Sequence, residues 1–145
     1  MKPVLLIALA AFLQQPASPQ TSLTGQPCTA AAVVGTWQFV ERTRGPQTDL
    51  GDLTAHKHVT PTHFIVTRVN REGIIDSAHG GPQMVTDGAY VETVAFFTTH
   101  ERYAKVQAGS KFTWDQCRME GDDWRIAGTY SGQAFEERWR RVGAR

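Results

Sequence analysis

Histidine is the residue of this 145-residue chain with the widest range of possible chemistry, because imidazole binds metal ions and transfers protons near neutral pH. The chain contains five histidines: His56, His58, His63, His79 and His100. On a β-strand, His56 and His58 lie on the same face, at a spacing that one metal ion could bridge. A third ligand would have to come from His63 or from a carboxylate such as Glu92. We expect His56 and His58 to face solvent and form hydrogen bonds rather than bind a metal, and we expect no cofactor.

The second candidate for chemistry is His63, whose side chain lies on one of the two faces of its strand. If that face is the interior one, His63 shares it with Ile65 and orients a ligand as a lone interior polar group. In the alternative, Phe64 and Val66 fill the core, although Arg68 then continues their face. The hydrophobic pattern leaves both orientations open.

Tyr90 and Glu92 occupy one face of a long, mostly apolar strand, where a buried carboxylate needs a cationic partner. Lys57, His63 or Arg138 could supply that cation. These five residues are therefore the candidate ligand-binding residues, and they would hold the polar head of an otherwise apolar ligand. An enzymatic alternative uses His63 with Glu92 or Tyr90 as the acid/base pair of an isomerase or hydrolase. The sequence has no Gly-x-Ser-x-Gly motif, phosphate-binding loop or zinc-protease helix motif that would favour another reaction.

The N-terminal segment predicts export. Lys2 is followed by an apolar stretch and by small residues, which is the pattern of a signal peptide at 1–17. No cysteine follows directly, so we expect a mature chain without a membrane anchor. Residues 18–30 are rich in Ser, Thr, Gln, Pro and Gly and predict a flexible arm. The remaining residues, 31–145, have a length that suits one domain.

The charge balance limits the classes of partner, and the cysteines indicate the cellular compartment. The formal net charge is +1, and without Lys2 the cations equal the 14 acids, so neither nucleic acid nor an acidic membrane is favoured. Cys28 and Cys117 are the two cysteines, and an exported chain meets oxidising conditions. We therefore expect a periplasmic or secreted monomer with a disulfide that closes a loop of about 90 residues.

The elements that must position these residues are strands. Alternating polar and apolar residues, separated by turn sequences, indicate strands at 33–44, 55–59, 63–69, 74–77, 83–85, 89–99, 111–119, 124–130 and 134–142. Gly80-Gly81-Pro82 is expected to end one strand, and residues 100–108 lack the alternation. About eight to ten strands joined by hairpins predict a single antiparallel up-and-down β-barrel, because closure removes exposed sheet edges.

Several segments between 33 and 142 carry a resemblance to a known family. They are Gly35-Thr36-Trp37, Lys57 to Phe64, Gly80-Gly81, Tyr90-Val91-Glu92 and Phe135 to Val142. The most specific of them is the sequence Thr-Pro-Thr-His-Phe at 60–64. They resemble a bacterial lipocalin-like family of secreted single-domain proteins, and fatty-acid-binding-like barrels of this size are similar too. The resemblance implies a calycin-type barrel with a central cavity.

Within such a barrel, Gly35 and Trp37 are expected to be structural. Trp37 would close the bottom against the last strand, where Arg138 or Arg140 stacks on its ring. The favoured function is an exported barrel that binds a small apolar or amphipathic ligand in its cavity. The first alternative is the barrel enzyme described above. The second is a non-enzymatic barrel that interacts with or inhibits another protein, and it would have a large exposed apolar patch instead of a pocket.

Overall fold

The computed structural model describes residues 22–46, 50–98, 107–130 and 132–143. The expected signal peptide, the first residues of the expected arm and His100 lie outside these ranges. Within the ranges, no helix has the length and apolar character needed to cross a membrane.

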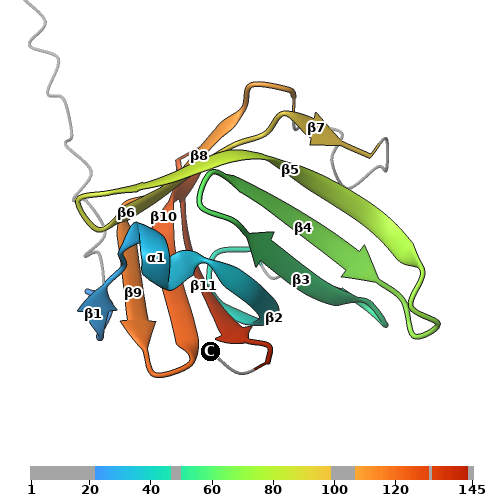
Figure 1. The fold of residues 1–145 in the computed structure, drawn as a ribbon, viewed down its shortest axis with the longest axis horizontal. Helices are drawn as coiled ribbons and strands as arrows, with labels where there is room; N and C mark the ends of the chain where they lie inside the picture. The colour runs from blue at the N-terminus through green and yellow to red at the C-terminus, as the bar shows by residue number, and fades with distance from the viewer. Residues whose placement is uncertain (1–21, 47–49, 99–106, 131, 144–145) are drawn as a thin grey trace, which may run out of the picture.

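Strands make up most of the described chain, and a single helical turn precedes the long ones (Figure 1). In chain order the elements are β1 (Gln26–Pro27), α1 (Ala30–Val33), β2 (Gly35–Arg44), β3 (Thr54–Val59), β4 (His63–Val69), β5 (Ile75–Thr86), β6 (Ala89–Thr93), β7 (Phe96–Phe97), β8 (Lys111–Trp114), β9 (Gln116–Glu120), β10 (Asp123–Tyr130) and β11 (Gln133–Arg141). β1 and β7 have two residues each, so nine of these strands are longer. The expected all-β architecture is confirmed.

All the strands belong to one antiparallel sheet in the order β1-β9-β10-β11-β2-β3-β4-β5-β6-β8, with β7 paired to β5. The first long strand, β2, pairs with the last, β11, and the bent sheet forms two walls, β3–β5 and β9–β11 (Figure 1). The sheet is not closed, because among the described residues no ladder joins β8 to β9 or β10. Instead β8 packs directly on β10, where a Cβ at Gly128 would lie 2.3 Å from the carbonyl oxygen of Thr113.

β5 continues through Gly80-Gly81-Pro82, where the sequence predicted a break. Gly80 and Gly81 do not form a turn; without side chains, they allow another segment to pack closely against β5. The end of β6 passes so close to Gly81 that a Cβ there would lie 2.0 Å from the carbonyl oxygen of Thr93. Just after β6, the amide of Ala95 donates to the carbonyl oxygen of Gly80. Two expected strands are also split: the chain bends after β6 and again between β8 and β9.

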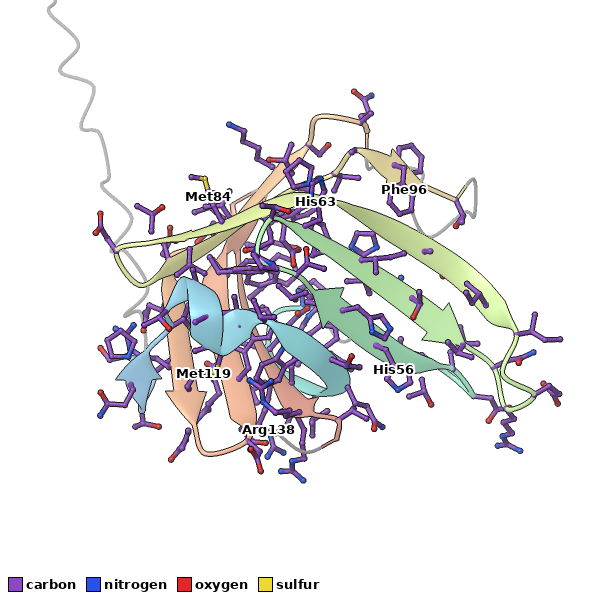
Figure 2. The ribbon with its side chains drawn as sticks, viewed as in Figure 1. His56, His63, Met84, Phe96, Met119 and Arg138 are labelled. Atoms are coloured by element: carbon purple, nitrogen blue, oxygen red, sulfur yellow. A yellow bond between two sulfur atoms is a disulfide. The ribbon has the colours of Figure 1, made fainter. Side chains whose placement is uncertain are left out.

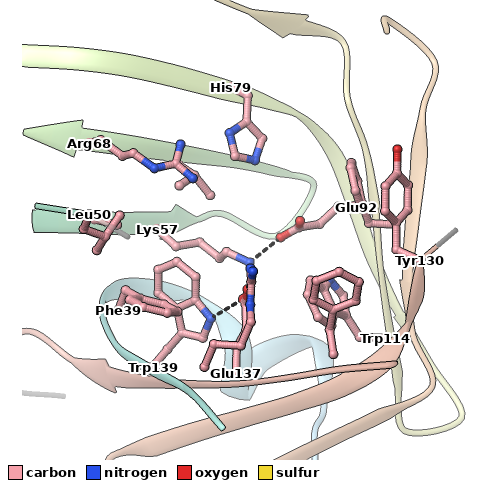
Figure 3. Close-up of a pocket in the computed structure, with 15 residues that line it drawn as sticks. Phe39, Leu50, Lys57, Arg68, His79, Glu92, Trp114, Tyr130, Glu137 and Trp139 are labelled. Atoms are coloured by element: carbon pink, nitrogen blue, oxygen red, sulfur yellow. Dashed lines mark hydrogen bonds and ion pairs between the residues drawn. The ribbon is translucent and has the colours of Figure 1, made fainter. Parts of the chain in front are cut away.

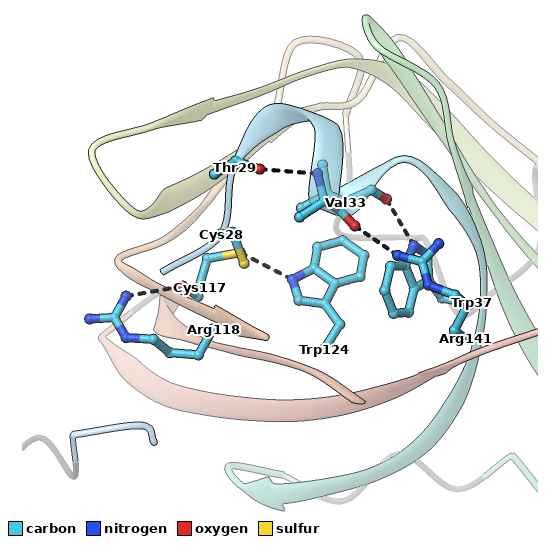
Figure 4. The surroundings of a disulfide bond; sticks show 9 residues. Cys28, Thr29, Val33, Trp37, Cys117, Arg118, Trp124 and Arg141 are labelled. Atoms are coloured by element: carbon cyan, nitrogen blue, oxygen red, sulfur yellow. Dashed lines mark hydrogen bonds between the residues drawn. A yellow bond between two sulfur atoms is a disulfide. The ribbon is translucent and has the colours of Figure 1, made fainter. Parts of the chain in front are cut away.

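The end of the molecule next to α1, which we call the closed end, is packed around aromatic rings. Trp37 and Trp124 are fully buried, with ring centroids 5.1 Å apart, and Tyr90 meets Trp124 edge to face at 4.9 Å. The expectation that Arg138 or Arg140 stacks on Trp37 is wrong. The guanidinium of Arg141 lies 4.1 Å from the Trp37 ring centroid, because Arg141 is the register partner of Trp37 (Figure 4).

Arg141 also fixes the segment around α1 to this end of the sheet. Its guanidinium donates to the carbonyl oxygens of Ala32 and Val34 at 2.8 and 3.0 Å. The Trp37 indole donates to the carbonyl oxygen of Val33 at 2.8 Å (Figure 4). These bonds satisfy carbonyl groups that a single helical turn leaves without partners.

The disulfide between Cys28 and Cys117 is confirmed, with Cα atoms 5.3 Å apart. It joins β9 to the residues before α1, and the Trp124 indole donates to Cys117 Sγ at 3.1 Å (Figure 4). β1 pairs with β9, and the Leu23 amide donates to Gln116 Oε1 at 2.9 Å. The part of the expected arm that the structure describes, from residue 22 onward, is therefore held against the sheet.

Candidate ligand-binding site

A cavity of about 230 Å³ lies between the two walls of the sheet (Figure 3). Its apolar lining consists of Phe39, Leu50, Ala55, Val66, Phe112, Trp114, Tyr130, Phe135 and Trp139. Its polar lining consists of Arg42, Lys57, Arg68, His79, Glu92 and Glu137. A mostly apolar and aromatic cavity with a few polar groups is the usual composition of a small-molecule site.

Strand alternation places the polar groups of one wall. On β3, Lys57 points inward between Ala55 and Val59, and it is buried like them. The cross-strand register then aligns Lys57 with Val66 of β4 and with His79 of β5. This wall of the cavity therefore carries a row of three aligned side chains, Lys57, Val66 and His79, one on each of three neighbouring strands.

Lys57 and Glu92 form a buried ion pair in this lining. Their Nζ and Oε1 atoms are 2.6 Å apart, and both side chains are at most 4 % exposed. Four aromatic rings surround the ammonium, with centroids 4.6 to 5.9 Å from Nζ: those of Trp139, Trp124, Tyr90 and Trp114. The carboxylate and the rings together stabilise a positive charge at this point.

Glu137 is the second buried carboxylate of the cavity. It accepts hydrogen bonds from the guanidinium of Arg42 at 2.5 Å and from the indole of Trp139 at 3.1 Å. The guanidinium of Arg42 also stands over the Phe135 ring at 4.9 Å. This group has its charge and hydrogen bonds satisfied within the protein, so its first role is to fix the aromatic lining.

Burial shifts the protonation of two groups near the ion pair. Desolvation, aided by the charges of Lys57 and Arg68, lowers the pKa of His79 to about 3, so its imidazole is neutral at physiological pH. Desolvation, followed by the charge of Glu92, raises the pKa of Tyr90 well above its usual value. His79 can therefore donate or accept a hydrogen bond in the cavity without adding charge.

The structure brings together only part of the predicted site. Lys57 and Glu92 line the cavity, and of the three cations considered for Glu92 the structure selects Lys57. Tyr90 lies beside them but is fully buried in the aromatic core and is not part of the cavity lining. The ligand-binding role of these residues remains a prediction.

His63 and Arg138 lie elsewhere. His63 is exposed at the start of β4, where its Nδ1 is 2.9 Å from Thr62 Oγ1 (Figure 2). Of the two orientations that the sequence leaves open for His63, the structure has the outward one, because Phe64 and Val66 take the inward positions. Arg138 lies on the outer face of β11, paired with Glu41 and Asp123.

His56 and His58 point away from the cavity on the outer face of β3, and their ring centroids are 6.4 Å apart. His58 Nδ1 is 3.1 Å from Thr36 Oγ1. Burial, and then the neighbouring His58, lower the pKa of His56. In the part of the chain that the structure describes, no group of three or more His, Cys, Asp or Glu side chains could hold a metal ion.

Four polar residues of the cavity lining were not predicted from the sequence: Arg42, Arg68, His79 and Glu137. Arg68 alternates in phase with Phe64 and Val66, so the sequence places it on their face, but the charge at the end of this apolar face left the orientation of the strand open. Nothing local indicates His79, because its strand was expected to end at the following glycine.

No protein-family model and no curated protein matches this chain. Similar solved structures include an uncharacterized protein from Bacteroides eggerthii DSM 20697, with a TM-score of 0.56 and 14 % identity over 75 % of this chain and 98 % of that chain. A lipocalin-like protein from Bacteroides uniformis ATCC 8492 matches with a TM-score of 0.54 and 12 % identity over 76 % of this chain and 98 % of that chain. At these identities the likeness concerns the fold alone, and it confirms the lipocalin-like fold that the sequence predicted.

Proposed function

We propose that this chain is an exported protein that binds a small amphipathic molecule in the cavity between the two walls of its sheet. The observation that carries the proposal is the lining itself: aromatic and aliphatic side chains surround a space of about 230 Å³, and Lys57, Arg68 and His79 offer polar contacts on one wall. The apolar part of the ligand would lie against Phe112, Trp114 and its neighbours, and its polar end would face β3–β5.

The disulfide supports the export part of the proposal. Structural disulfides are typical of compartments outside the reducing cytoplasm. The bond between Cys28 and Cys117 agrees with the signal-peptide pattern at 1–17. These two observations together support a periplasmic or secreted location.

Cavity-filling variants test the binding. Ala55 lies in the cavity lining and His56, its neighbour on β3, points to the outer face. Ala55→Phe should therefore reduce the affinity for a fluorescent amphiphile such as 1-anilinonaphthalene-8-sulfonate at least tenfold, whereas His56→Phe should leave it unchanged. Equal affinities in the two variants would refute this site.

Native mass spectrometry identifies the natural ligand class. The disulfide-bonded protein purified from its own host should carry a small molecule that is released on denaturation. The Ala55→Phe variant, purified in the same way, should carry less of it. A molecule bound equally by both variants would lie outside the cavity.

A further inference from the structure

Lys57 has a reactive group in a position where it can do more than hold a ligand. Its side chain is part of the cavity lining and 2 % exposed, and Glu92 Oε1 lies 2.6 Å from its Nζ. A lysine amine within hydrogen-bond reach of a carboxylate can add to carbonyl compounds, because the carboxylate takes up and returns the proton. We propose that Lys57 forms a reversible imine with an aldehyde group of the ligand, an inference that rests on the proposed function of the cavity.

The step needs only the ligand and the two side chains. Glu92 accepts one proton from the Lys57 ammonium, and the nitrogen lone pair that is freed forms a bond to the aldehyde carbon. After the proton moves from nitrogen to oxygen, the adduct is a neutral carbinolamine. Glu92 then returns its proton to the hydroxyl group, the C–O bond breaks, and water leaves. The products are a protonated imine at Lys57, a carboxylate at Glu92 and one water molecule, so atoms and charge balance.

The surroundings of Nζ stabilise the protonated imine as well as they stabilise the Lys57 ammonium. An ammonium and a protonated imine both carry one positive charge on the same nitrogen. The four ring centroids within 5.9 Å and the carboxylate of Glu92 stabilise that charge in either state. Imine formation therefore does not leave Glu92 as an uncompensated buried charge, which would be strongly destabilising.

The cavity provides space for the carbon skeleton that the imine attaches to Lys57. Trp114 is both a neighbour of the ammonium and a residue of the cavity lining, and Phe112 lies on the same strand. An apolar or aromatic tail would lie against these rings. Apolar walls also limit the access of water, and limited access slows hydrolysis of an imine.

The chain allows a clean chemical test because it has only four lysines: Lys2, Lys57, Lys105 and Lys111. Lys111 begins β8 and is exposed. It therefore reports how an ordinary surface amine reacts under the same conditions.

The experiment treats the disulfide-bonded protein with cinnamaldehyde and sodium cyanoborohydride, which reduces an imine to a stable amine. Peptide mapping by mass spectrometry then gives the occupancy at each lysine. We expect at least tenfold faster labelling at Lys57 than at Lys111. Cinnamyl alcohol, which has the same skeleton without the carbonyl group, should protect Lys57 but not Lys111.

Variants separate the contributions of Lys57 and Glu92 to the labelling. Lys57→Arg keeps a cation beside Glu92 and should abolish labelling at this position while Lys111 reacts as before. Glu92→Gln removes the proton acceptor and should slow labelling of Lys57 at least tenfold. If Glu92→Gln fails to fold, Ala55→Phe replaces it, because a filled cavity should also prevent labelling of Lys57.

The outcomes distinguish this inference from the proposed function. If cinnamyl alcohol changes the tryptophan fluorescence but Lys57 is labelled no faster than Lys111, the imine is refuted and the binding cavity stands. If the alcohol neither binds nor protects and Lys57 is not labelled, both proposals fail for ligands of this class. Labelling of Lys57 that the alcohol does not reduce refutes a reaction inside the cavity.

Discussion

The ion pair between Lys57 and Glu92 makes a quantitative prediction about stability. Both side chains are at most 4 % exposed, so each charge depends on the other for compensation. Removing one partner of such a pair typically costs about 3–5 kcal/mol, because an unpaired charge stays buried. We expect Lys57→Met to lower the free energy of unfolding by this amount, and Glu92→Leu to act similarly.

The double variant has the opposite expectation. With both charges replaced by apolar groups of similar size, no unpaired charge remains, and Lys57→Met/Glu92→Leu should lie within about 1 kcal/mol of the natural protein. The two single effects are then far from additive, as expected for side chains in direct contact.

The assay is urea unfolding at neutral pH with the disulfide intact, followed by tryptophan fluorescence and by circular dichroism to verify two-state behaviour. The exposed pair of Arg71 and Asp52 is the control, with side chains 76 % and 72 % exposed. Arg71→Met should cost less than about 1 kcal/mol. A cost below 1 kcal/mol for Lys57→Met as well would refute the reasoning, since it would mean that solvent or movement compensates Glu92.

Three further predictions concern other parts of the fold. Replacing Cys28 and Cys117 with alanine should lower the free energy of unfolding by up to about 4.5 kcal/mol in the chain-entropy model, measured by urea unfolding, and an unchanged midpoint would contradict this. The folded protein keeps His79 neutral to a pKa of about 3, whereas the unfolded chain binds the proton near 6.5, so stability should fall as the pH drops from 6.5 toward 3 by up to about 1.4 kcal/mol per pH unit. His79→Gln should flatten that dependence, and an NMR titration that showed His79 protonated at pH 5 would exclude it. Gly81→Ala should lower the melting temperature, because its Cβ would lie 2.0 Å from the carbonyl oxygen of Thr93, and an unchanged melting temperature would show that the segment moves aside freely.

The pattern of β3 indicates that Lys57 points inward, but it does not indicate its partner. Its neighbours Ala55 and Val59 are apolar and share its parity, so alternation alone places the lysine inside the sheet. Its partner could not be chosen from the sequence, because Glu92 lies 35 residues away and the pairing depends on how the sheet bends. Alternation describes one strand at a time, and it does not say which strands face one another across a cavity.

The orientation of β4 and the course of β5 show two further limits. Arg68 is the last residue of the inward face of β4, and it lines the cavity. Because this face carries a charge, hydrophobicity alone could not decide which face of β4 points inward. Gly80 and Gly81 are turn residues by composition, yet they remain within a strand because the chain crosses closely over them. In both cases the missing information is a contact with a distant segment.

The ion pair also bears on why the interior is not simply filled. The closed end shows that this chain packs aromatic side chains tightly where it needs stability, as Trp37 and Trp124 do. At the boundary between that core and the cavity it places Lys57 and Glu92 instead, a pair that apolar residues could replace with little loss of stability. If the double variant is as stable as the natural protein but loses its ligand, the pair adds nothing to the stability of the fold and serves binding.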